Sequence, residues 1–527
     1  MTTLHDWATV APQKPALIQA ESGHVITYGE LDARAIRAAQ WLVSRGLEAG
    51  DCIAVLVENH PGLIEIASAA RRVGLYYTAV NTHLSPAEAA YVLKDCGAKL
   101  LIASPAMLPL VEAVRAADAH ALDLPVFVLA GASNLPPGFE AYEAAISAFA
   151  PDATLPPRPV GRDMLYSSGT TGHPKGIRRP LTPYEDRDKP ELEIIAWRRA
   201  FGFDENTVYL STAPFYHAAP LRYIMRTLDV GGTCVAMAKY DAEGALAAVE
   251  RYRVTHSQWV PTMFVRLLGL PEEARRRYDL SSMKVAIHAA APCPVHVKQA
   301  MLDWWGDILY EYYAGSEGAG TTSIGPLEWR KYPGSVGRAS AGVIHIVDDA
   351  GNELPPNEVG MIFFSGVATF SYHNAPEKTR SAYNDKGWAT YGDLGYVNEE
   401  GYLFLSDRRA DLILSGGVNV YPQEIESVLM QHPSVADVAV IGVPDPELGE
   451  VPKAVIELRD GRAATPDLAQ DIVDYCQGRL GRLKLPRTVV FDERLPRTPT
   501  GKLLRRELKD RHREQPHSGH AVRTGRA

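Results

Sequence analysis

The sequence predicts an α/β fold, with a large N-terminal domain and a small α+β C-terminal domain. At 527 residues the chain exceeds one ordinary domain. Strand-like and helix-like segments alternate as far as Ala341, and the charged joint SDRRAD precedes a unit of the size of an independent domain. We expect an N-terminal domain over 1–406, a hinge over 407–411, a C-terminal domain over 412–509 and a disordered tail over 510–527, which is polar with scattered His and Arg.

The first part of the chain alternates helix and strand signals. Thr27–Glu30 is a capping box that predicts a helix to about Arg45, and Ser85–Glu88 is a second box with Pro at the first helical position. Apolar runs predict strands that begin at Cys52, Tyr76, Lys99 and Pro125. Alternation of this kind indicates a parallel sheet covered by helices.

A second α/β unit follows the Pro-rich spacer 151–159 and a charged segment, 178–193. We interpret 178–193 as a surface excursion, with a lid as the less favoured alternative. Strands are expected from Val208, Thr233, Val254, Val285 and Asp307. From Ala341, short runs at Val343, Gly360 and Gly401 predict a β-rich subdomain. In the C-terminal unit we expect a helix from Tyr421, strands over 435–443 and 451–458, and a helix over 469–480.

Composition excludes several classes of protein. The net charge is −9, from 54 basic and 63 acidic residues, which disfavours nucleic acid as a partner. The 5 cysteines form no C-x-x-C pair, so neither a zinc site nor a disulfide framework is supported. The chain shows no signal peptide and no apolar run of the ~18 residues that span a bilayer. We expect a cytoplasmic enzyme without a transmembrane segment; its oligomeric state, a homodimer included, stays open.

The stretch YSSGTTGHPKG, residues 166–176, is built for an anion. Its glycines let the backbone approach a ligand closely, exposed N–H groups form an anion-binding concavity, and the hydroxyls and Lys175 add donors. A flexible linker is the alternative, which Pro174-Lys175 and the flanking periodic segments disfavour. The spacing is not that of a P-loop. A polyphosphate is the natural guest.

Six further islands accompany this stretch: PFYHAAP at 214–220, HAAAPCP at 288–294, YEYYAGSEG at 310–318, YGDLG at 391–395, DRRADLILSGGVNVYPQEIE at 407–426 and PRTPTGKLLRR at 496–506. In this order and spacing they resemble the adenylate-forming superfamily of acyl-CoA synthetases, aryl-CoA ligases, peptide-synthetase adenylation domains and beetle luciferases. The resemblance covers nearly the whole chain. It implies an N-terminal adenylation domain and a mobile C-terminal domain.

The resemblance implies roles for individual residues around MgATP. The phosphate cradle would be Ser167, Ser168, Gly169, Thr170, Thr171, Gly172 and Lys175. The adenine slot would be Ala290, Ala291, Pro292, Glu311, Tyr312 and Tyr313. Ser316 stands where the family usually has Thr and would donate a hydrogen bond to the α-phosphate. Glu317 and Thr170 would hold Mg²⁺, and Asp393 and Arg408 would bind the ribose. Lys502 would stabilise the transition state.

Several of these residues have plainer interpretations when taken alone. Asp393 could be a turn residue and Glu317 a helix cap, while Arg408 and Lys502 could be solvated surface charges; the motifs favour the functional roles. His217 is evenly balanced between the acyl pocket and a hydrogen-bonded core position. Trp259 and His288 are favoured as core or pocket wall.

The implied reaction has two halves: a carboxylate attacks MgATP to give acyl-AMP and pyrophosphate, and a thiol such as coenzyme A then displaces AMP. In the family the C-terminal domain rotates between the halves. Lys502 would leave, and Ser415, Gly416 and Gly417 would line the pantetheine tunnel. The family's pivot usually carries Asp or Lys where Ala410 stands, so the pivot is either shared by Arg409, Ala410 and Asp411 or needs no charged side chain.

An AMP-forming acid–CoA ligase is the first choice of function. An adenylation enzyme that loads a carrier protein is the second, a luciferase-like oxygenase the third, and a non-enzymatic binding protein the last. Amino-acid activation is disfavoured because PFYHAAP contains no Asp. The acyl pocket would be lined by His217, Ala218, Tyr223, Trp259 to Thr262, Ala289, Ala314 and Gly315, with no Lys or Arg that demands a second carboxylate. Fatty, aryl and polycyclic side-chain acids stay open.

Overall fold

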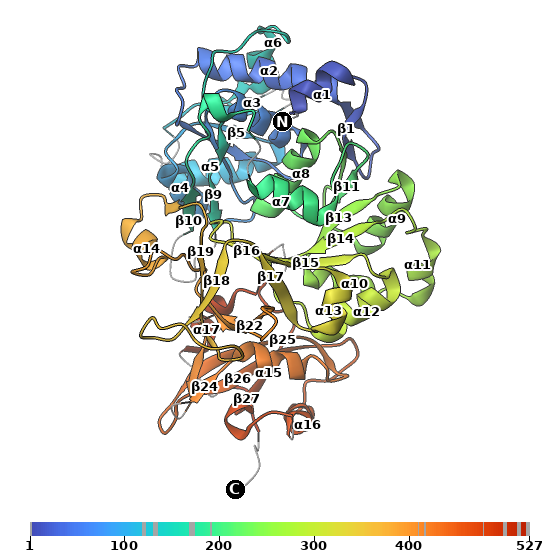
Figure 1. The fold of residues 1–527 in the computed structure, drawn as a ribbon, viewed down its shortest axis with the longest axis vertical. Coiled ribbons are helices and arrows are strands. Elements are labelled where there is room, and N and C mark those ends of the chain that lie inside the picture. Colours follow the sequence, from blue (N-terminus) through green and yellow to red (C-terminus); the bar gives the residue numbers. More distant parts are fainter. Residues whose placement is uncertain are drawn as a thin grey trace.

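The chain folds into a large N-terminal domain and a smaller C-terminal domain, which lies at the bottom of Figure 1 in orange and red. The computed structural model describes residues 3–117, 123–129, 135–167, 174–189, 192–408, 411–415, 418–477, 479–498, 503–513 and 518–522. None of the helices in these ranges combines the length and the apolar character that a bilayer crossing requires.

The first α/β unit is a six-stranded parallel sheet in the order β7-β6-β5-β3-β4-β8. Its strands are β3 (Cys52–Leu56), β4 (Tyr76–Ala79), β5 (Ala98–Ala103), β6 (Val126–Val128), β7 (Glu140–Ala141) and β8 (Arg162–Asp163). The helices of this part are α1 (Leu4–Val10), α2 (Tyr28–Ser44), α3 (Pro61–Arg72), α4 (Pro86–Asp95), α5 (Leu108–Ala117) and α6 (Tyr142–Ser147). Both predicted capping boxes form, at the starts of α2 and α4, and each satisfies backbone N–H groups that the helix itself leaves unpaired.

The second unit is built on a thirteen-stranded sheet that also contains the predicted β-rich subdomain. Its parallel part comprises β1 (Pro15–Gln19), β11 (Val208–Ser211), β12 (Thr233–Ala236), β13 (His256–Trp259), β14 (Val285–His288) and β15 (Leu309–Ala314). The helices associated with it are α7 (Leu192–Phe201), α8 (Ala218–Asp229), α9 (Ala242–Tyr252), α10 (Pro261–Leu268), α11 (Glu272–Arg277), α12 (Val295–Trp305) and α13 (Pro326–Lys331). The strand β2 (Val25–Thr27) closes the edge beyond β1.

The β-rich part continues this sheet through antiparallel strands. They are β16 (Thr321–Ile324), β17 (Ser335–Ala341), β18 (Val343–Val347), β19 (Gly360–Ser365), β21 (Asp393–Val397) and β22 (Leu403–Arg408). We expected a separate subdomain from Ala341, whereas β16 and β17 begin the antiparallel part earlier and join it to β15. A small three-stranded sheet, β20-β10-β9, lies apart from it, with β9 (Leu165–Ser167), β10 (Lys175–Arg178) and β20 (Ser371–Tyr372), and α14 (Pro376–Ser381) follows β20.

The C-terminal domain packs its own apolar core around a six-stranded sheet. Its strands are β23 (Ile413–Ser415), β24 (Val418–Val420), β25 (Val435–Asp445), β26 (Gly449–Leu458), β27 (Thr488–Asp492) and β28 (His520–Ala521), and its helices are α15 (Pro422–Leu429), α16 (Pro466–Cys476) and α17 (Arg505–Arg513).

The expectation of a disordered tail from residue 510 needs correction for the described residues. The helix α17 continues through Arg513, because Leu508 is buried against the C-terminal core and Arg506 pairs with Asp510 one turn away. Beyond it, His520 pairs with Val489 in the antiparallel ladder of β27 and β28. Backbone hydrogen bonding therefore fixes part of this polar segment.

Candidate active site

A cavity of about 2390 Å³ lies where the two domains face each other. Strand ends and turns of the N-terminal domain line one side, and α15, β25 and α17 with the residues before it line the other. The lining includes the following residues proposed from the sequence: Lys175, His217, Ala218, Tyr223, Trp259 to Thr262, Ala289 to Pro292, Glu311 to Glu317 and Asp393. One cavity thus brings together segments from all seven motifs.

Strand β15 distributes its side chains by simple alternation, since neighbouring residues of a strand point to opposite faces. Glu311 is buried and forms an ion pair with Lys298 of α12, with 2.5 Å between Nζ and Oε2. Tyr312 points the other way, accepts a hydrogen bond from Gln258 and stacks on Tyr223 of α8 at 6.2 Å. Tyr313 returns to the nucleotide side. The three residues that we assigned to one slot therefore face two different environments.

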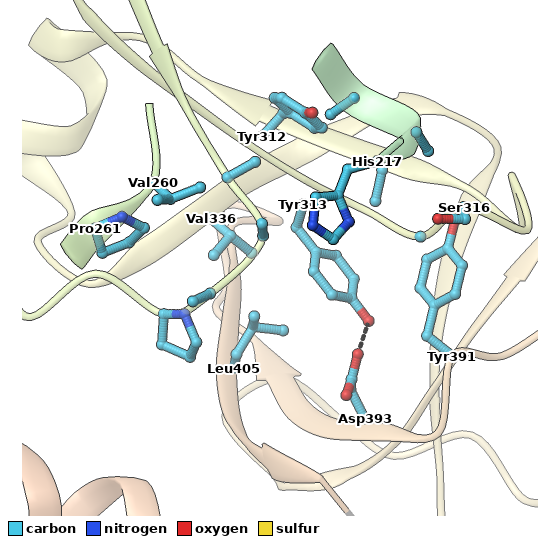
Figure 2. Close-up of a pocket in the computed structure, with 18 of the residues that line it drawn as sticks. His217, Val260, Pro261, Tyr312, Tyr313, Ser316, Val336, Tyr391, Asp393 and Leu405 are labelled. Carbon is cyan, nitrogen blue, oxygen red and sulfur yellow. Dashed lines mark hydrogen bonds between the residues drawn. The ribbon is translucent and has the colours of Figure 1, made fainter. Parts of the chain in front are cut away.

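The candidate ribose residue Asp393 begins β21, beside the backbone of Arg408 on β22. Its Oδ2 accepts a hydrogen bond of 2.6 Å from the Tyr313 hydroxyl, which is the dashed line in Figure 2. His217, the N-cap residue of α8, lines the same cavity and is labelled in Figure 2. A carboxylate offers about four acceptor sites, and the Tyr313 hydroxyl uses one of them.

The candidate adenine segment, 290–292, lies just after β14 and contains a strained residue. Ala290 has φ of 75°, a conformation that residues with a Cβ rarely adopt. Such backbone costs on the order of 1–3 kcal/mol and persists where the surrounding structure over-determines it, commonly at binding sites. The preceding His288 is fully buried, and burial together with the Lys298 ammonium lowers its pKa well below the ordinary value. His288 is therefore a neutral core residue, as favoured from the sequence.

The candidate phosphate region is placed by the hairpin of β9 and β10. Lys175 pairs with Ser167 across this hairpin. Gly176 packs against the ring of Tyr166, since a Cβ there would lie 2.8 Å from a ring carbon. Burial lowers the pKa of Lys175, the nearby Lys378 lowers it further, and Glu317 opposes both. The ammonium of Lys175 thus stands in a partly desolvated position next to a carboxylate.

Glu317 lies in the turn after β15 and accepts a hydrogen bond of 2.9 Å from the Tyr372 hydroxyl. Among the described residues, no group of three or more His, Cys, Asp or Glu side chains is arranged to hold a metal ion. Mg²⁺ commonly uses one or two carboxylates and takes its other oxygens from substrate phosphates and water. A single carboxylate near Lys175, the candidate phosphate residue, fits that requirement.

Two family models match the chain: the AMP-binding enzyme model over residues 4–372 and the AMP-binding enzyme C-terminal domain over 424–502. The chain belongs to the AMP-binding enzymes. It is 32% identical over 520 residues to the long-chain-fatty-acid–CoA ligase FadD13 of Mycobacterium tuberculosis, which covers 97% of each chain. It is 33% identical over 515 residues to a feruloyl-CoA synthase of an Amycolatopsis species, covering 96% of this chain and 97% of the other.

A solved structure of ATP-bound MatB from Rhodopseudomonas palustris has the same fold. It superposes with a TM-score of 0.82 at 28% identity and covers 98% of this chain and 99% of its own. The two-domain α/β architecture and the resemblance to the adenylate-forming superfamily are thus confirmed.

Some predicted residues of this AMP-binding enzyme lie outside the described residues: Ser168 to Gly172, Arg409, Ala410, Gly416, Gly417 and Lys502. Their neighbours show which face of the C-terminal domain is presented. Thr498 and Leu503, on either side of the Lys502 loop, line the cavity. Ser415 is buried within the C-terminal domain and is not part of that lining. The side of the domain that carries Thr498 and Leu503 therefore faces the cavity.

The structure describes the two ends of the expected hinge, 407–411. β22 carries the chain through Arg408. Asp411 already belongs to the C-terminal domain, because it pairs with Lys509 at 3.2 Å and with Arg505 at 3.6 Å on α17. Arg505 also holds Glu426 of α15 at 2.7 Å. Asp411 thus anchors the C-terminal side of the joint.

Two arginines accompany the residues that we expected around the acyl pocket. Arg222 and Arg226 of α8 line the cavity, although the predicted set did not include them. Arg222 is engaged by Asp163 at 2.7 Å and by the Ser316 carbonyl at 3.4 Å. Trp259 is 1% exposed, and its indole N–H donates to the Ser257 hydroxyl, so its ring belongs to the core.

Sequence reasoning missed Lys298, Tyr372 and the arginines of α8. A buried lysine on a helix carries the same local signal as a surface lysine, and Tyr372 stands in an ordinary loop segment. For the two arginines one sequence signal was available. Arg222 and Arg226 follow Ala218 and Ala219 at a spacing of three to four residues, which places them on the same face of a helix.

Proposed function

We propose that this AMP-binding enzyme is an AMP-forming acid–CoA ligase. The observation that carries the proposal is the convergence on one cavity of Lys175 from β10, Glu317 from the turn after β15 and Asp393 from β21. MgATP needs an ammonium for its phosphates, a carboxylate for its hard cation and a carboxylate for its ribose hydroxyls. The names of both curated relatives, a fatty-acid–CoA ligase and a feruloyl-CoA synthase, support the ligase assignment.

In the first half-reaction, the substrate carboxylate attacks the α-phosphorus and pyrophosphate leaves. Mg²⁺, when bound with ATP, would neutralise charge on the phosphates. Lys175 and the backbone of the 168–172 loop would hold the β- and γ-phosphates, and Asp393 with Arg408 would fix the ribose. Lys502 would approach the α-phosphate and stabilise the developing charge. Since the substrate carboxylate is already a nucleophile, positioning supplies most of the rate enhancement.

In the second half-reaction, the C-terminal domain would rotate about residues 409–410, and a thiol would attack the acyl carbon while AMP leaves. The Lys502 face would withdraw, and the loop of Ser415 to Gly417 would take its place beside the thiol path. Asp411 would travel with the domain, because its ion pairs lie within it. Hinge closure of this type divides one site between two reactions.

The test is a panel of fatty, aryl and polycyclic acids offered with ATP, Mg²⁺ and coenzyme A, with pyrophosphate, AMP and thioester measured separately. Lys502→Ala should reduce pyrophosphate release by about 10²-fold or more and leave conversion of supplied acyl-AMP to thioester intact. Lys484→Ala is the matched control, since Lys484 lies in the same domain and pairs with Glu424. Equal loss of both half-reactions in Lys502→Ala would contradict the division of roles.

The same panel separates the two alternatives. Acyl-AMP that forms but transfers only to the phosphopantetheine arm of a carrier protein would assign the carrier-loading function. Oxygen uptake or light from acyl-AMP would assign an oxygenase. Thioester formation with coenzyme A alone supports the ligase.

A further inference from the structure

Tyr372 is placed beside the candidate phosphate site by the small three-stranded sheet. It ends β20, which pairs antiparallel with β10 so that Tyr372 lies opposite Ile177. The next residue, His373, donates its backbone N–H to the Gly176 carbonyl at 2.8 Å. The Tyr372 N–H itself donates to the Thr379 hydroxyl at the start of the following helix. Backbone bonds on both sides therefore hold the Tyr372 side chain in place.

The hydroxyl of Tyr372 restrains the Glu317 carboxylate. It donates to Oε1 at 2.9 Å. The other oxygen, Oε2, is confined from behind, because it lies 2.7 Å from the point that a Cβ on Gly315 would occupy. One donor and one close backbone approach fix the orientation of the carboxylate.

The ring of Tyr372 meets the second charged group of the site. The Lys175 ammonium lies 4.9 Å from the ring centroid, within the range in which a cation is attracted to an aromatic face. This contact matters because Lys175 is partly buried and is repelled by Lys378. The ring offers the ammonium a weak, non-competing partner that leaves its three N–H donors for an anion.

We propose that Tyr372 is a positioning residue for the polyphosphate end of the site. Through its hydroxyl it orients Glu317 for the cation that accompanies ATP, and through its ring it holds Lys175 for the phosphates. The proposal deepens the proposed function and rests on it, since it requires that MgATP binds in this cavity. Tyr372 would touch neither the reacting carboxylate nor the α-phosphorus.

The two contacts can be separated by two substitutions. Tyr372→Phe removes the hydroxyl and keeps the ring, whereas Tyr372→Leu removes both. Tyr383→Phe is the matched control, because Tyr383 lies in the same segment. Its hydroxyl accepts from the Phe370 N–H at 2.8 Å and donates to the Phe370 carbonyl at 2.9 Å. Thermal melting of all three variants reports whether the segment still folds.

ATP binding is measured by equilibrium dialysis over a Mg²⁺ titration, and pyrophosphate release is measured in parallel. Tyr372→Phe should raise the Mg²⁺ concentration needed for half-maximal ATP binding by about 10-fold, the size expected for one hydrogen bond to a charged group, while ATP binding without Mg²⁺ stays as in the wild type. Tyr372→Leu should show the same Mg²⁺ shift and in addition bind metal-free ATP several-fold more weakly. Thioester formation from supplied acyl-AMP should be unchanged in both variants.

An unchanged Mg²⁺ requirement in Tyr372→Phe would overturn the proposal, as would an equal shift in Tyr383→Phe. These outcomes are distinct from failure of the proposed function. If the wild type binds ATP and releases no pyrophosphate with any acid, the ligase assignment fails while the binding titration still decides the role of Tyr372.

Discussion

The buried Lys298–Glu311 ion pair lies behind the candidate adenine segment. Replacing Lys298 should lower the folding stability of the protein. Both side chains are out of solvent, at 0% exposure for Lys298 and 7% for Glu311. His288 also lies near the Glu311 carboxylate, with its Nε2 3.5 Å away, and it is neutral. Lys298→Met would therefore leave a buried carboxylate without a compensating charge, which costs about 3–5 kcal/mol of folding free energy.

The pH dependence of this loss follows from the sign of the Glu311 shift. Burial raises the pKa of Glu311, and Lys298 opposes that shift. Without Lys298 the folded-state pKa rises further above the unfolded value of about 4.3. A carboxyl group with a raised folded pKa is most favourable at acid pH, and its contribution is lost as pH rises through that pKa. Lys298→Met should therefore be more destabilised at pH 8 than at pH 5.

Urea denaturation at the two pH values measures both effects, and ATP dialysis reports the neighbouring binding segment. The double variant Lys298→Met with Glu311→Gln should recover most of the stability, because replacing both charges avoids the unpaired carboxylate. Two results would refute the reasoning. One is a Lys298→Met variant within about 1 kcal/mol of the wild type at pH 8, since a buried pair broken on one side costs more than that. The other is a double variant no more stable than the single one.

Two further substitutions test the cavity walls. Gly315→Ala would place a Cβ 2.3 Å from the Tyr391 ring. The resulting overpacking costs about 1–3 kcal/mol and should weaken ATP binding by about 10-fold or more. Wild-type affinity for ATP in equilibrium dialysis would contradict the close approach. Tyr312→Ala removes the stack on Tyr223 and the hydrogen bond from Gln258. The preferred acid should therefore become longer or bulkier, as measured by kcat/KM over a chain-length series. An unchanged preference would show that Tyr312 is not a wall of the acyl pocket.

The sequence indicates the layered units well because hydrophobic periodicity records local burial. Runs such as Cys52–Leu56 and Val285–His288 are buried throughout and appear as parallel strands. Strands whose partners are distant are harder to predict. The polar segment Thr321–Ile324 becomes β16 by pairing on both sides, and Pro15–Gln19 becomes β1 by pairing with β12, more than 200 residues later. Register between such segments depends on the whole fold.

For the candidate site, the sequence predicted the residues within the motifs. It did not predict the residues elsewhere in the chain that pack against them and orient them. Asp393 and Glu317 stand in short Gly-rich islands whose composition signals a ligand. Lys298 lies in an amphipathic helix, where a lysine ordinarily faces water, and only packing against Glu311 and the Trp329 ring at 4.8 Å distinguishes it. The orientation of Glu317 depends on Tyr372, 55 positions away. Such pairs arise from tertiary geometry, which no local pattern encodes.

The continuous thirteen-stranded sheet limits where this enzyme can be recombined with another chain. Tyr313 lies on β15 and Asp393 on β21, and the ladder β15-β16-β17-β22-β21 connects them without interruption. The two halves of this hydrogen-bonded pair therefore share one cooperative unit, and amide hydrogen exchange should show them losing protection together. Recombination of this chain with another should succeed at the C-terminal joint and fail at a crossover between β15 and β22, because only the second cut divides the ladder.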